Sequence, residues 1–277
     1  MRDLSGFAEG LRPGGDGVWY AASGEQVSYP GDGHKATLAV EERSFWYRHR
    51  NACVLAALRR FPPLGTLFDV GGGNGVVAAA LLRAGIDTVL VEPGAGAVVN
   101  AQARGIEDIV CATFSSARFR PGALPSIGMF DVAEHVADDA LLFREVFHLL
   151  QRGGRLYVTV PAYQWLWSPE DKYAGHFRRY RLSTLCEVLV AEGFSVSYAS
   201  YFFSFLPIPI FLFRSLSSRL GLRRVAGGAR AAREHGAESQ YVSALMEGAL
   251  RWEATWVSAG RAIPSGSSLL LVAQRSG

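Results

Sequence analysis

The sequence is poor in cysteine, and the spacing of the few cysteines excludes several kinds of site. Its 277 residues include only Cys53, Cys111 and Cys186, which lie far apart. No CxxC pair is present, so neither a zinc knuckle nor a redox dithiol is expected. An odd number of cysteines also argues against a disulfide framework. The sequence therefore predicts a protein of the reducing cytoplasm.

Charge of one sign and long apolar runs are scarce as well. The net charge is +3 and charged residues make up 19% of the chain, so no broad basic field indicates a nucleic-acid partner. The first residues, MRDLSGFAEG, lack the apolar core of a signal peptide. The most apolar run, residues 201–213, carries two prolines and is shorter than the roughly 20 apolar residues of a membrane-spanning helix. We expect no transmembrane helix.

What the sequence does have is a set of short apolar runs that alternate with helical patterns. The runs lie at 66–70, 88–91, 109–111, 127–132, 156–160, 195–200 and 268–274, and helical patterns lie at 76–84, 97–104, 138–150 and 182–192. Continuous apolar strands separated by helices are typical of a parallel sheet that is covered on both faces. We predict an α/β fold with a mostly parallel seven-stranded sheet.

The remaining segments divide the chain into a core and two additions. Residues 1–36 are rich in glycine and lack periodicity, which predicts an irregular N-terminal arm. A helix is expected over 41–60 because apolar residues recur at helical spacing before two prolines. Residues 201–265 separate the last two strands, which predicts a helical insertion or lid. The core is then 37–200 together with 266–277.

A glycine-rich loop follows the first predicted strand of the core. The strand ends at Asp69 and continues into GGGNG at 71–75, which precedes a helix. Glycines allow a backbone to approach a ligand closely, and the helix start offers free N–H groups. Dinucleotide dehydrogenases share this geometry but have a third glycine, where this sequence has Val76 and Val77. Glu92 closes the second strand, where a carboxylate can accept hydrogen bonds from both ribose hydroxyls.

Three motifs resemble those of class I S-adenosylmethionine-dependent methyltransferases. DVGGGNG at 69–75 is similar to their D-x-G-x-G-x-G motif, Glu92-Pro93 to their second motif, and QRGGRL at 151–156 to the turn before their fifth strand. The chain is identified as a member of this class, and it resembles the bacterial type 11 subgroup over about residues 40–200. The resemblance implies a Rossmann-like fold, S-adenosylmethionine as cofactor, and methyl transfer to O or N of a small-molecule acceptor.

The resemblance also implies contacts to the cofactor. Gly71 and Gly73 would approach the methionine part, Asp69 would orient its amino-acid end, and Glu92, followed by Pro93, would hold the ribose. Asp69 has an alternative role as a cap of the loop.

Three further positions carry over with alternatives. Thr113 stands where the family usually has an aspartate that reads the adenine amino group, and a hydroxyl accepts that hydrogen bond more weakly. Phe114 either stacks on the adenine ring or packs in the core. FWYRHRN at 45–51 resembles a stretch whose arginine meets the methionine carboxylate. Arg50 shares a helix face with Trp46, although it fits a solvated arginine equally well.

The motif DVAEH at 131–135 supplies candidates for chemistry. Methyl transfer is an in-line displacement, so the protein supplies alignment and, where needed, a base. Asp131, at the end of the fourth strand, should face the sulfonium region. His135 is either a catalytic base or a structural cap. The motif is also similar to the E-x-x-E-H of ubiquinone-pathway O-methyltransferases, which is associated with a divalent metal, but one short motif is weak evidence and we expect no metal.

The segment at 161–180, PAYQWLWSPEDKYAGHFRRY, resembles a signature of the type 11 subgroup. A loop of this composition at the carboxyl edge of an α/β sheet is where an acceptor is expected. His176 is a second candidate base. The substrate-binding candidates are Trp165, Trp167, Tyr173, Arg178 and Arg179. Alternatively, the arginines and His176 form a charge network with Asp171 that stiffens the loop.

Three other functions compete with a small-molecule methyltransferase. A nicotinamide-dependent oxidoreductase lacks its third glycine here, and a non-catalytic relative would bind cofactor without turnover. A peripheral membrane enzyme acting on a lipid-linked acceptor is compatible with the apolar run at 201–213 and the arginines after it. A buried lid or a homodimer face is the alternative for that run.

Overall fold

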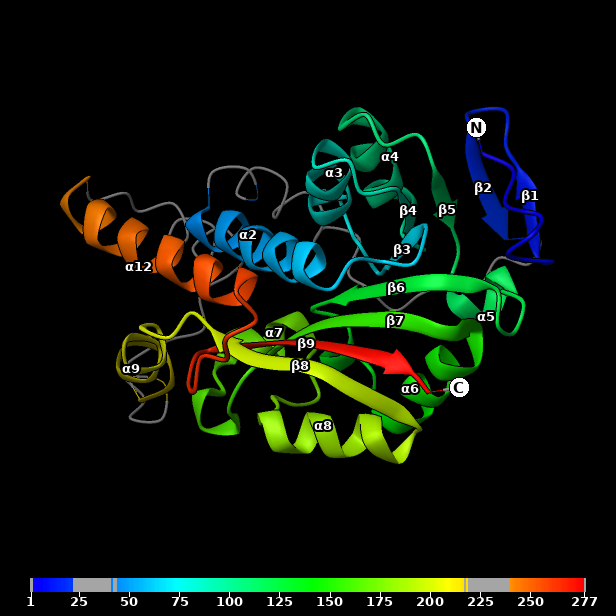
Figure 1. The fold of residues 1–277 in the computed structure, drawn as a ribbon. Coiled ribbons are helices and arrows are strands. Elements are labelled where there is room, and N and C mark those ends of the chain that lie inside the picture. Colours follow the sequence, from blue (N-terminus) through cyan, green and yellow to red (C-terminus); the bar gives the residue numbers. More distant parts are fainter. Residues whose placement is uncertain (1, 22–40, 42–43, 217, 219–239, 277) are drawn as a thin grey trace.

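The computed structural model describes residues 2–21, 41, 44–216, 218 and 240–276, and these build one mixed sheet. Its nine strands have the order β1-β2-β5-β4-β3-β6-β7-β9-β8 (Figure 1). They are β1 (Leu11–Pro13), β2 (Val18–Ala21), β3 (Leu67–Val70), β4 (Thr88–Val91), β5 (Ile109–Cys111), β6 (Leu124–Phe130), β7 (Leu150–Pro161), β8 (Phe194–Phe202) and β9 (Ser268–Arg275). All pairs from β2 to β7 are parallel, whereas β9 runs antiparallel to both β7 and β8. The predicted Rossmann-like α/β class is confirmed.

Helices cover both faces of the sheet. One face carries α2 (Phe45–Arg60), α3 (Val76–Arg83), α4 (Ala95–Ala103) and α12 (Gln240–Ser258), and the other carries α5 (Phe114–Ala117), α6 (Asp139–Leu149) and α8 (Leu182–Ala191) (Figure 1). Successive residues of a strand face opposite layers, so Leu67 joins the core under α2 while Phe68 joins the core on the opposite face. Burial on both faces explains the continuous apolar runs in the sequence.

The expectation of an irregular N-terminal arm and of seven strands is wrong for the first residues. Val18, Trp19 and Tyr20 of β2 pair in parallel with β5, and β1 adds an antiparallel edge strand. Val18 and Trp19 are buried. The strand is only four residues long and follows glycine-rich sequence, so it leaves little periodicity, although its aromatic and β-branched residues favour a strand. Residues 22–36 of the expected arm lie outside the described residues.

Helix α2 is the element that reaches over the glycine loop. It begins at Phe45 because the Ser44 hydroxyl accepts a hydrogen bond from the Trp46 N–H, which caps the helix. Its buried side packs on the sheet and on α12, where Cys53 and Leu58 share a core with Leu250. This packing fixes α2 across the carboxyl ends of the central strands.

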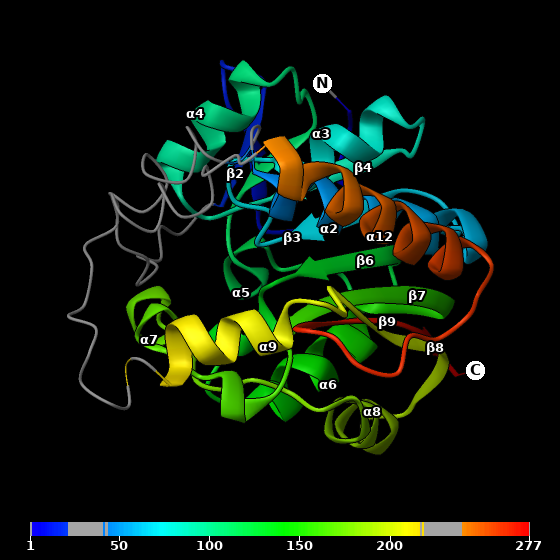
Figure 2. The same cartoon turned by 90° about the vertical axis from the view of Figure 1, so that its left-hand side faces the viewer.

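The segment 201–265 continues β8 to Phe202 and then forms helices. These are α9 (Pro207–Ile210), the π-helix η3 (Phe211–Leu216) and α12, and the charged stretch at 223–239 lies outside the described residues. η3 is tied to the loop after β7, because the Ser215 hydroxyl donates to the Leu166 carbonyl over 2.9 Å. Figure 2 shows α9 and α7 (Pro169–Ala174) at the same end of the sheet. Among the described helices, none is long and apolar enough to cross a membrane.

Candidate cofactor and acceptor site

The loop after β3 is shaped by its glycines. Gly71, Gly73 and Gly75 have φ values of 69°, 55° and 76°, a region that side chains other than glycine rarely adopt. A Cβ atom on Gly72 would lie 2.7 Å from a carboxylate oxygen of Asp69, whereas a Cβ on Gly73 would meet nothing within 4 Å. The loop therefore curls tightly over Asp69 and leaves open space above Gly73.

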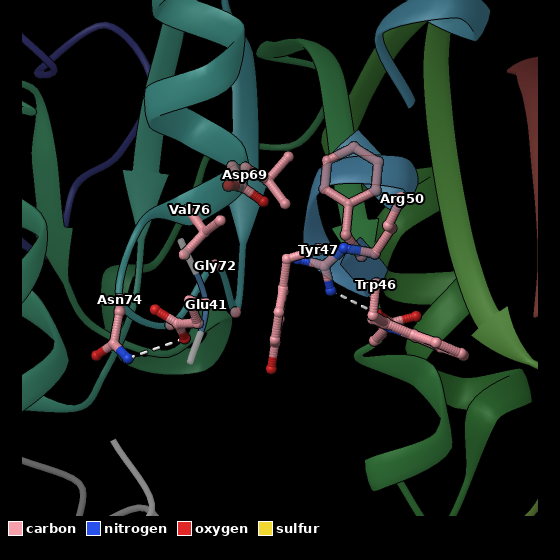
Figure 3. A pocket seen from close by; sticks show the side chains of 13 residues that line it. Glu41, Trp46, Tyr47, Arg50, Asp69, Gly72, Asn74 and Val76 are labelled. Atoms are coloured by element: carbon pink, nitrogen blue, oxygen red, sulfur yellow. Dashed lines mark hydrogen bonds and ion pairs between the residues drawn. The ribbon is translucent and has the colours of Figure 1, made fainter. Parts of the chain in front are cut away.

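A pocket of about 200 Å³ lies between this loop, α2 and the end of β6 (Figure 3). It is lined by Glu41, Trp46, Tyr47, Arg50, Asp69, Gly71, Gly72, Gly73, Asn74, Val76, Val77, Phe130 and Asp131. Five residues that the sequence assigned to the cofactor are thus brought together: Arg50, Asp69, Gly71, Gly73 and Asp131. Trp46, Tyr47 and Arg50 come from α2 and stand across from the loop in Figure 3.

Asp69 is fully buried beneath the loop. Neither of its carboxylate oxygens meets a hydrogen-bond donor in good geometry among the described residues. Burial raises the pKa of Asp69 to about 7, although the nearby Arg50 guanidinium acts in the opposite direction. An orphaned buried carboxyl at the floor of a pocket is suited to a ligand that brings hydrogen-bond donors or positive charge.

Arg50 is 8% exposed, so it is not a solvated arginine on a helix surface. Its Nη1 donates to Oδ2 of Asp131 over 2.5 Å, and its guanidinium lies 5.0 Å from the centre of the Tyr47 ring. The Thr159 hydroxyl holds the other oxygen of Asp131 at 2.9 Å. Asp131 itself has a φ of 60°, which turns its side chain from the end of β6 toward α2. Although burial disfavours the charged guanidinium, Asp131 and its neighbours hold the pKa of Arg50 above its ordinary value.

Glu92 follows β4 and supports the same loop. Its two carboxylate oxygens accept hydrogen bonds from the backbone N–H groups of Gly73, at 3.0 Å, and Gly94, at 2.7 Å. Burial raises the pKa of Glu92. Each oxygen keeps lone-pair capacity for a second donor, so the position suits a ribose. The next residue, Pro93, is half-buried and turns its carbonyl toward Cys111, whose Sγ lies 3.8 Å away.

Of the eight pocket residues that were missed as cofactor candidates, four carry polar side-chain groups: Glu41, Trp46, Tyr47 and Asn74. Glu41 accepts a hydrogen bond from the Asn74 amide at 3.0 Å, drawn as a dashed line in Figure 3, and pairs with Arg104 at 2.9 Å. Asn74 occupies a variable position of the glycine motif, and Glu41 precedes α2 with no motif of its own. Only the aromatic pair Trp46–Tyr47, inside the quoted F-W-x-x-R stretch, offered a signal.

Thr113 and Phe114 lie outside this pocket. The Thr113 hydroxyl caps α5 by accepting a hydrogen bond from the Ser116 N–H at 3.1 Å. The ring of Phe114 packs edge to face on Phe119 with centroids 5.8 Å apart, within the buried core. Both side chains therefore have structural roles, Thr113 as a helix cap and Phe114 in the core. Their contact with adenine stays a prediction.

Two histidines meet beside the end of β6. The rings of His135, in the 3₁₀ turn η1 (Ala133–His135), and His176 stand edge to face with centroids 4.7 Å apart. Burial, followed by the neighbouring His176, lowers the pKa of His135 to about 4. The Nδ1 atom of His176 lies 2.9 Å from Oδ1 of Asp171. This contact engages Nδ1 and leaves the other ring nitrogen, Nε2, outside the pair with Asp171.

Asp171 organises the loop after β7. Arg179 donates hydrogen bonds to both carboxylate oxygens of Asp171, at 2.8 and 3.0 Å. The backbone N–H of Ser168 donates to Oδ2 of Asp171 as well. Despite burial, His176 and Arg179 lower the pKa of Asp171 to about 2. Arg178 forms an ion pair with Asp139 at 2.7 Å and also donates to the Ala137 carbonyl. Arg179 and His176 thus pair with Asp171, as in the charge network that the sequence left open as an alternative to acceptor binding, whereas Arg178 pairs with Asp139.

The aromatic candidates of this loop are more accessible than the arginines. Trp165 and Tyr173 are exposed, and Trp167 is half-buried. Trp165 stacks on Tyr163 at 5.6 Å and meets the edge of Phe211 from η3 at 5.4 Å. The structure therefore brings the loop and the insertion together in one aromatic cluster.

Two groups among the described residues bring three possible metal ligands close together: Glu134, His135 and His176, and His49, Cys53 and Glu253. Glu134 is buried, and its Oε2 has no hydrogen-bond partner in the part of the chain that the structure describes. Burial, and then the charge of Asp131, raises the pKa of Glu134 well above its ordinary value. Without a bound cation, the protonated form of Glu134 is therefore favoured.

The fold and the pocket define a Rossmann-like protein with a glycine-rich loop at the carboxyl end of its central strand, above a buried carboxyl group. Residues 45–199, more than half of the chain, match a family described as a methyltransferase domain, and the chain belongs to this family. It is a class I S-adenosylmethionine-dependent methyltransferase. The orphaned Asp69 carboxyl and the open space above Gly73 fit this cofactor, because its amino-acid part carries an ammonium group.

Curated relatives match only part of the chain. A ubiquinone biosynthesis O-methyltransferase from Xylella fastidiosa (strain 9a5c) is 28% identical over 108 residues, which are 36% of this chain and 44% of the relative. An uncharacterized methyltransferase from Mycobacterium sp. (strain JLS) is 36% identical over 104 residues, 36% of this chain and 40% of the relative. The matches thus span about two fifths of these relatives' length.

Solved structures share the fold at low identity. Phosphoethanolamine N-methyltransferase 2 from Haemonchus contortus, in complex with S-adenosyl-L-methionine, aligns with a TM-score of 0.54 and 16% identity over 91% of this chain and 59% of that chain. The methyltransferase complexed with the Haloferax volcanii Trm112 activator aligns with a TM-score of 0.59 and 17% identity, over 91% of this chain and 100% of that chain. At this identity the likeness establishes the fold.

Proposed function

We propose that this enzyme methylates an oxygen or nitrogen atom of a small-molecule acceptor, which binds between the cofactor pocket and the loop at 161–180. The observation that carries the proposal is the Asp171–His176 pair, because it lies beside the motif whose first residue, Asp131, lines the cofactor pocket. When bound, S-adenosylmethionine supplies a methyl group on a sulfonium that is already activated for displacement. The protein must then align the acceptor and take up its proton.

The cofactor-binding roles follow from the pocket. Asp69 and Arg50 are assigned to the amino-acid end of the cofactor, where a carboxylate and a guanidinium complement an ammonium and a carboxylate. Gly71 and Gly73 supply close backbone, and Glu92 with Pro93 receives the ribose. Asp131 is assigned to the sulfonium region, because it lines the pocket at the end of β6.

Thr113 and Phe114 are assigned to the adenine end, as the resemblance implies.

His176 is assigned the role of base. Asp171 holds Nδ1, so the proton of a neutral ring resides there and Nε2 is free to accept the acceptor's proton. Asp171 also stabilises the imidazolium that forms, as an orienting carboxylate does in other acid–base sites. His135, with its pKa lowered to about 4, is neutral at physiological pH and a weak base, so it supports His176 through the edge-to-face ring contact.

The acceptor itself is assigned to the aromatic side chains of the loop. Trp165, Trp167 and Tyr173 offer flat apolar surfaces that suit an aromatic or sugar ring. Arg178 and Arg179 hold the loop in place through Asp139 and Asp171 and steady the acceptor through that frame. Phe211 and Ser215 of η3 contact Trp165 and the Leu166 carbonyl. With these contacts, η3 and the preceding α9 close this region as a lid and exclude water from the reaction. The three free cysteines support a cytoplasmic location.

A second candidate is a peripheral membrane enzyme that acts on a lipid-linked acceptor. Ile208 and Leu212 of α9 and η3 are 70% and 48% exposed, and the exposed Trp165 lies beside them through Phe211. Apolar side chains on a surface next to an acceptor loop favour contact with lipid. Co-sedimentation with anionic lipid vesicles supports this candidate if binding is lost in Ile208→Ser/Leu212→Ser. If that double variant instead converts a dimer into a monomer, the face is a homodimer contact.

An unbiased metabolite screen with labelled cofactor tests the first proposal. With the acceptor identified, His176→Ala should lower kcat about 100-fold or more, with cofactor affinity and KM nearly unchanged. Asp171→Asn should lower kcat less and move the pH optimum downward, because the imidazolium loses its carboxylate partner. Glu107→Gln, at an exposed carboxylate, is the control. Full turnover of both His176→Ala and His135→Ala across pH 6–9 would show that neither ring is a base.

A further inference from the structure

The insertion contributes one fully buried carboxylate to the helix that lines the cofactor pocket. Glu253 of α12 is 0% exposed, and its Oε2 lies 2.7 Å from Nε2 of the buried His49 on α2. Cys53 stands one helical turn further along α2, with its Sγ 3.4 Å from the same nitrogen. A buried carboxylate is strongly unfavourable unless its oxygens are paired, so the partners of Glu253 indicate what it holds.

Both oxygens of Glu253 are fully engaged. Oε2 also accepts a hydrogen bond from the Phe203 N–H at 2.7 Å, and Oε1 accepts from the N–H and the hydroxyl of Ser204, each at 2.6 Å. Although burial opposes ionisation, His49 and Ser204 hold the pKa of Glu253 below its ordinary value. With two donors on each oxygen, the carboxylate has no lone pair left for a metal ion. It acts as an acceptor that gathers α2 and the turn after β8.

Two short routes connect this carboxylate to the cofactor pocket. Through His49 it holds the turn of α2 that carries Arg50, whose guanidinium lines the pocket. Through the Phe203 N–H it fixes a residue with a left-handed φ of 57°, and the Phe203 ring stacks on Trp46 at 4.0 Å with an interplanar angle of 16°. Trp46 lines the pocket as well. The wall of the pocket therefore rests on a group supplied by the insertion.

We propose that Glu253 is a positioning residue for cofactor binding. It fixes the position of Trp46 and Arg50 of α2 relative to the glycine loop. In this way it couples the insertion at 201–265 to the amino-acid half of the cofactor. The adenosine half is assigned to Glu92 and the adenine-end residues, and the described hydrogen bonds of Glu253 go instead to His49, Phe203 and Ser204. The inference concerns binding alone, needs no acceptor, and stands or falls separately from the proposed methyl acceptor.

Glu253→Gln tests the proposal. An amide replaces one acceptor oxygen with an NH₂ donor, so at least one of the buried backbone N–H groups of Phe203 and Ser204 loses its partner. The Kd for S-adenosylhomocysteine, measured by calorimetry, should rise about tenfold. The Kd for 5′-methylthioadenosine, which lacks the amino-acid part, should change by less than about twofold, within the effect of one weak contact. The matched control is Glu247→Gln, which alters an exposed carboxylate on the same helix and should leave both values unchanged.

A second pair of variants keeps the test decisive if Glu253→Gln does not fold. His49→Gln retains an N–H donor toward Glu253 and should preserve S-adenosylhomocysteine binding, whereas His49→Ala should weaken it selectively. Equal losses for the two ligands would assign Glu253 a general structural role and overturn the proposal. Unchanged S-adenosylhomocysteine affinity in a folded Glu253→Gln variant would overturn it as well.

Discussion

The buried carboxyl of Asp69 gives the enzyme a measurable dependence of stability on pH. It lies under the glycine loop with no exposed surface, and among the described residues no donor reaches it in good geometry. Burial raises its pKa to about 7, although the Arg50 guanidinium and the Ala78 N–H act in the opposite direction. The perturbation is Asp69→Asn, which keeps the shape of the side chain and removes its ionisation. Because the folded pKa is raised, the contribution of Asp69 to stability is full below pH 3.8 and is lost as the pH rises through about 7.

The size of the effect follows from the two pKa values. Ionising a carboxyl in the folded chain costs about 1.4 kcal/mol for each unit by which its pKa exceeds the unfolded value. With values of 3.8 and about 7, the cost develops mostly between pH 5 and pH 8. Over this interval the free energy of unfolding of the wild-type chain should fall by about 2.5 kcal/mol relative to Asp69→Asn. For a chain of this length the corresponding change in Tm is about 5 °C or more.

Thermal unfolding of the cofactor-free protein at pH 5 and pH 8 measures this difference. Asp69→Asn should gain stability over the wild type as the pH rises, while Glu107→Gln, at an exposed carboxylate, should follow the wild type. The same variant should bind S-adenosylhomocysteine about tenfold more weakly, because a charge-assisted contact to the ligand's ammonium is lost. A stability difference that is the same at both pH values would refute the assignment of a raised pKa to Asp69.

Two further predictions concern the cofactor and the metal. Glu92→Ala should weaken S-adenosylhomocysteine binding about tenfold or more in calorimetry, because Gly73, Gly94 and the ribose all lose an acceptor; unchanged affinity would remove Glu92 from the site. Protein purified without chelator should hold no stoichiometric divalent ion in elemental analysis, since only one short motif, DVAEH at 131–135, favours a metal. An ion that is present in the wild type and lost in Glu134→Ala would contradict this.

The central sheet could be predicted from local pattern. β4 and β5 have the bounds expected from their apolar runs, because each is a short strand buried on both faces. β7 was expected to begin at residue 156 but begins at Leu150, which pairs with Leu124 of β6 across a register shift. The turn at Gly153, with a φ of 74°, is absorbed into the strand and held by the Gln274 amide. The extension of β7 to Leu150 depends on its pairing with β6, which the local sequence pattern does not show.

The cofactor pocket could be predicted in part for a similar reason. Asp69, Gly71 and Gly73 lie within one strand–loop–helix unit, so their spacing alone places them together. Glu41 and Asn74, by contrast, are 33 positions apart and belong to no common short motif. His49 and Glu253 form a contact although they are 204 positions apart. Pairs of this kind arise from the packing of whole elements, which local periodicity does not specify.

The charges around Arg50 show why the pocket is not arranged for the stability of the free protein. Three carboxyl groups, those of Asp69, Asp131 and Glu134, lie close enough to this single guanidinium to interact with it. Of these three, Asp131 forms an ion pair with the guanidinium, and burial raises the pKa of the other two. A cluster with more acids than bases binds protons in place of the missing cations. A ligand that carries an ammonium and a sulfonium supplies those cations instead, so its binding should release protons from Asp69. Binding of a cationic cofactor relieves the unfavourable burial of these carboxyl groups, and this relief contributes to the affinity for the cofactor.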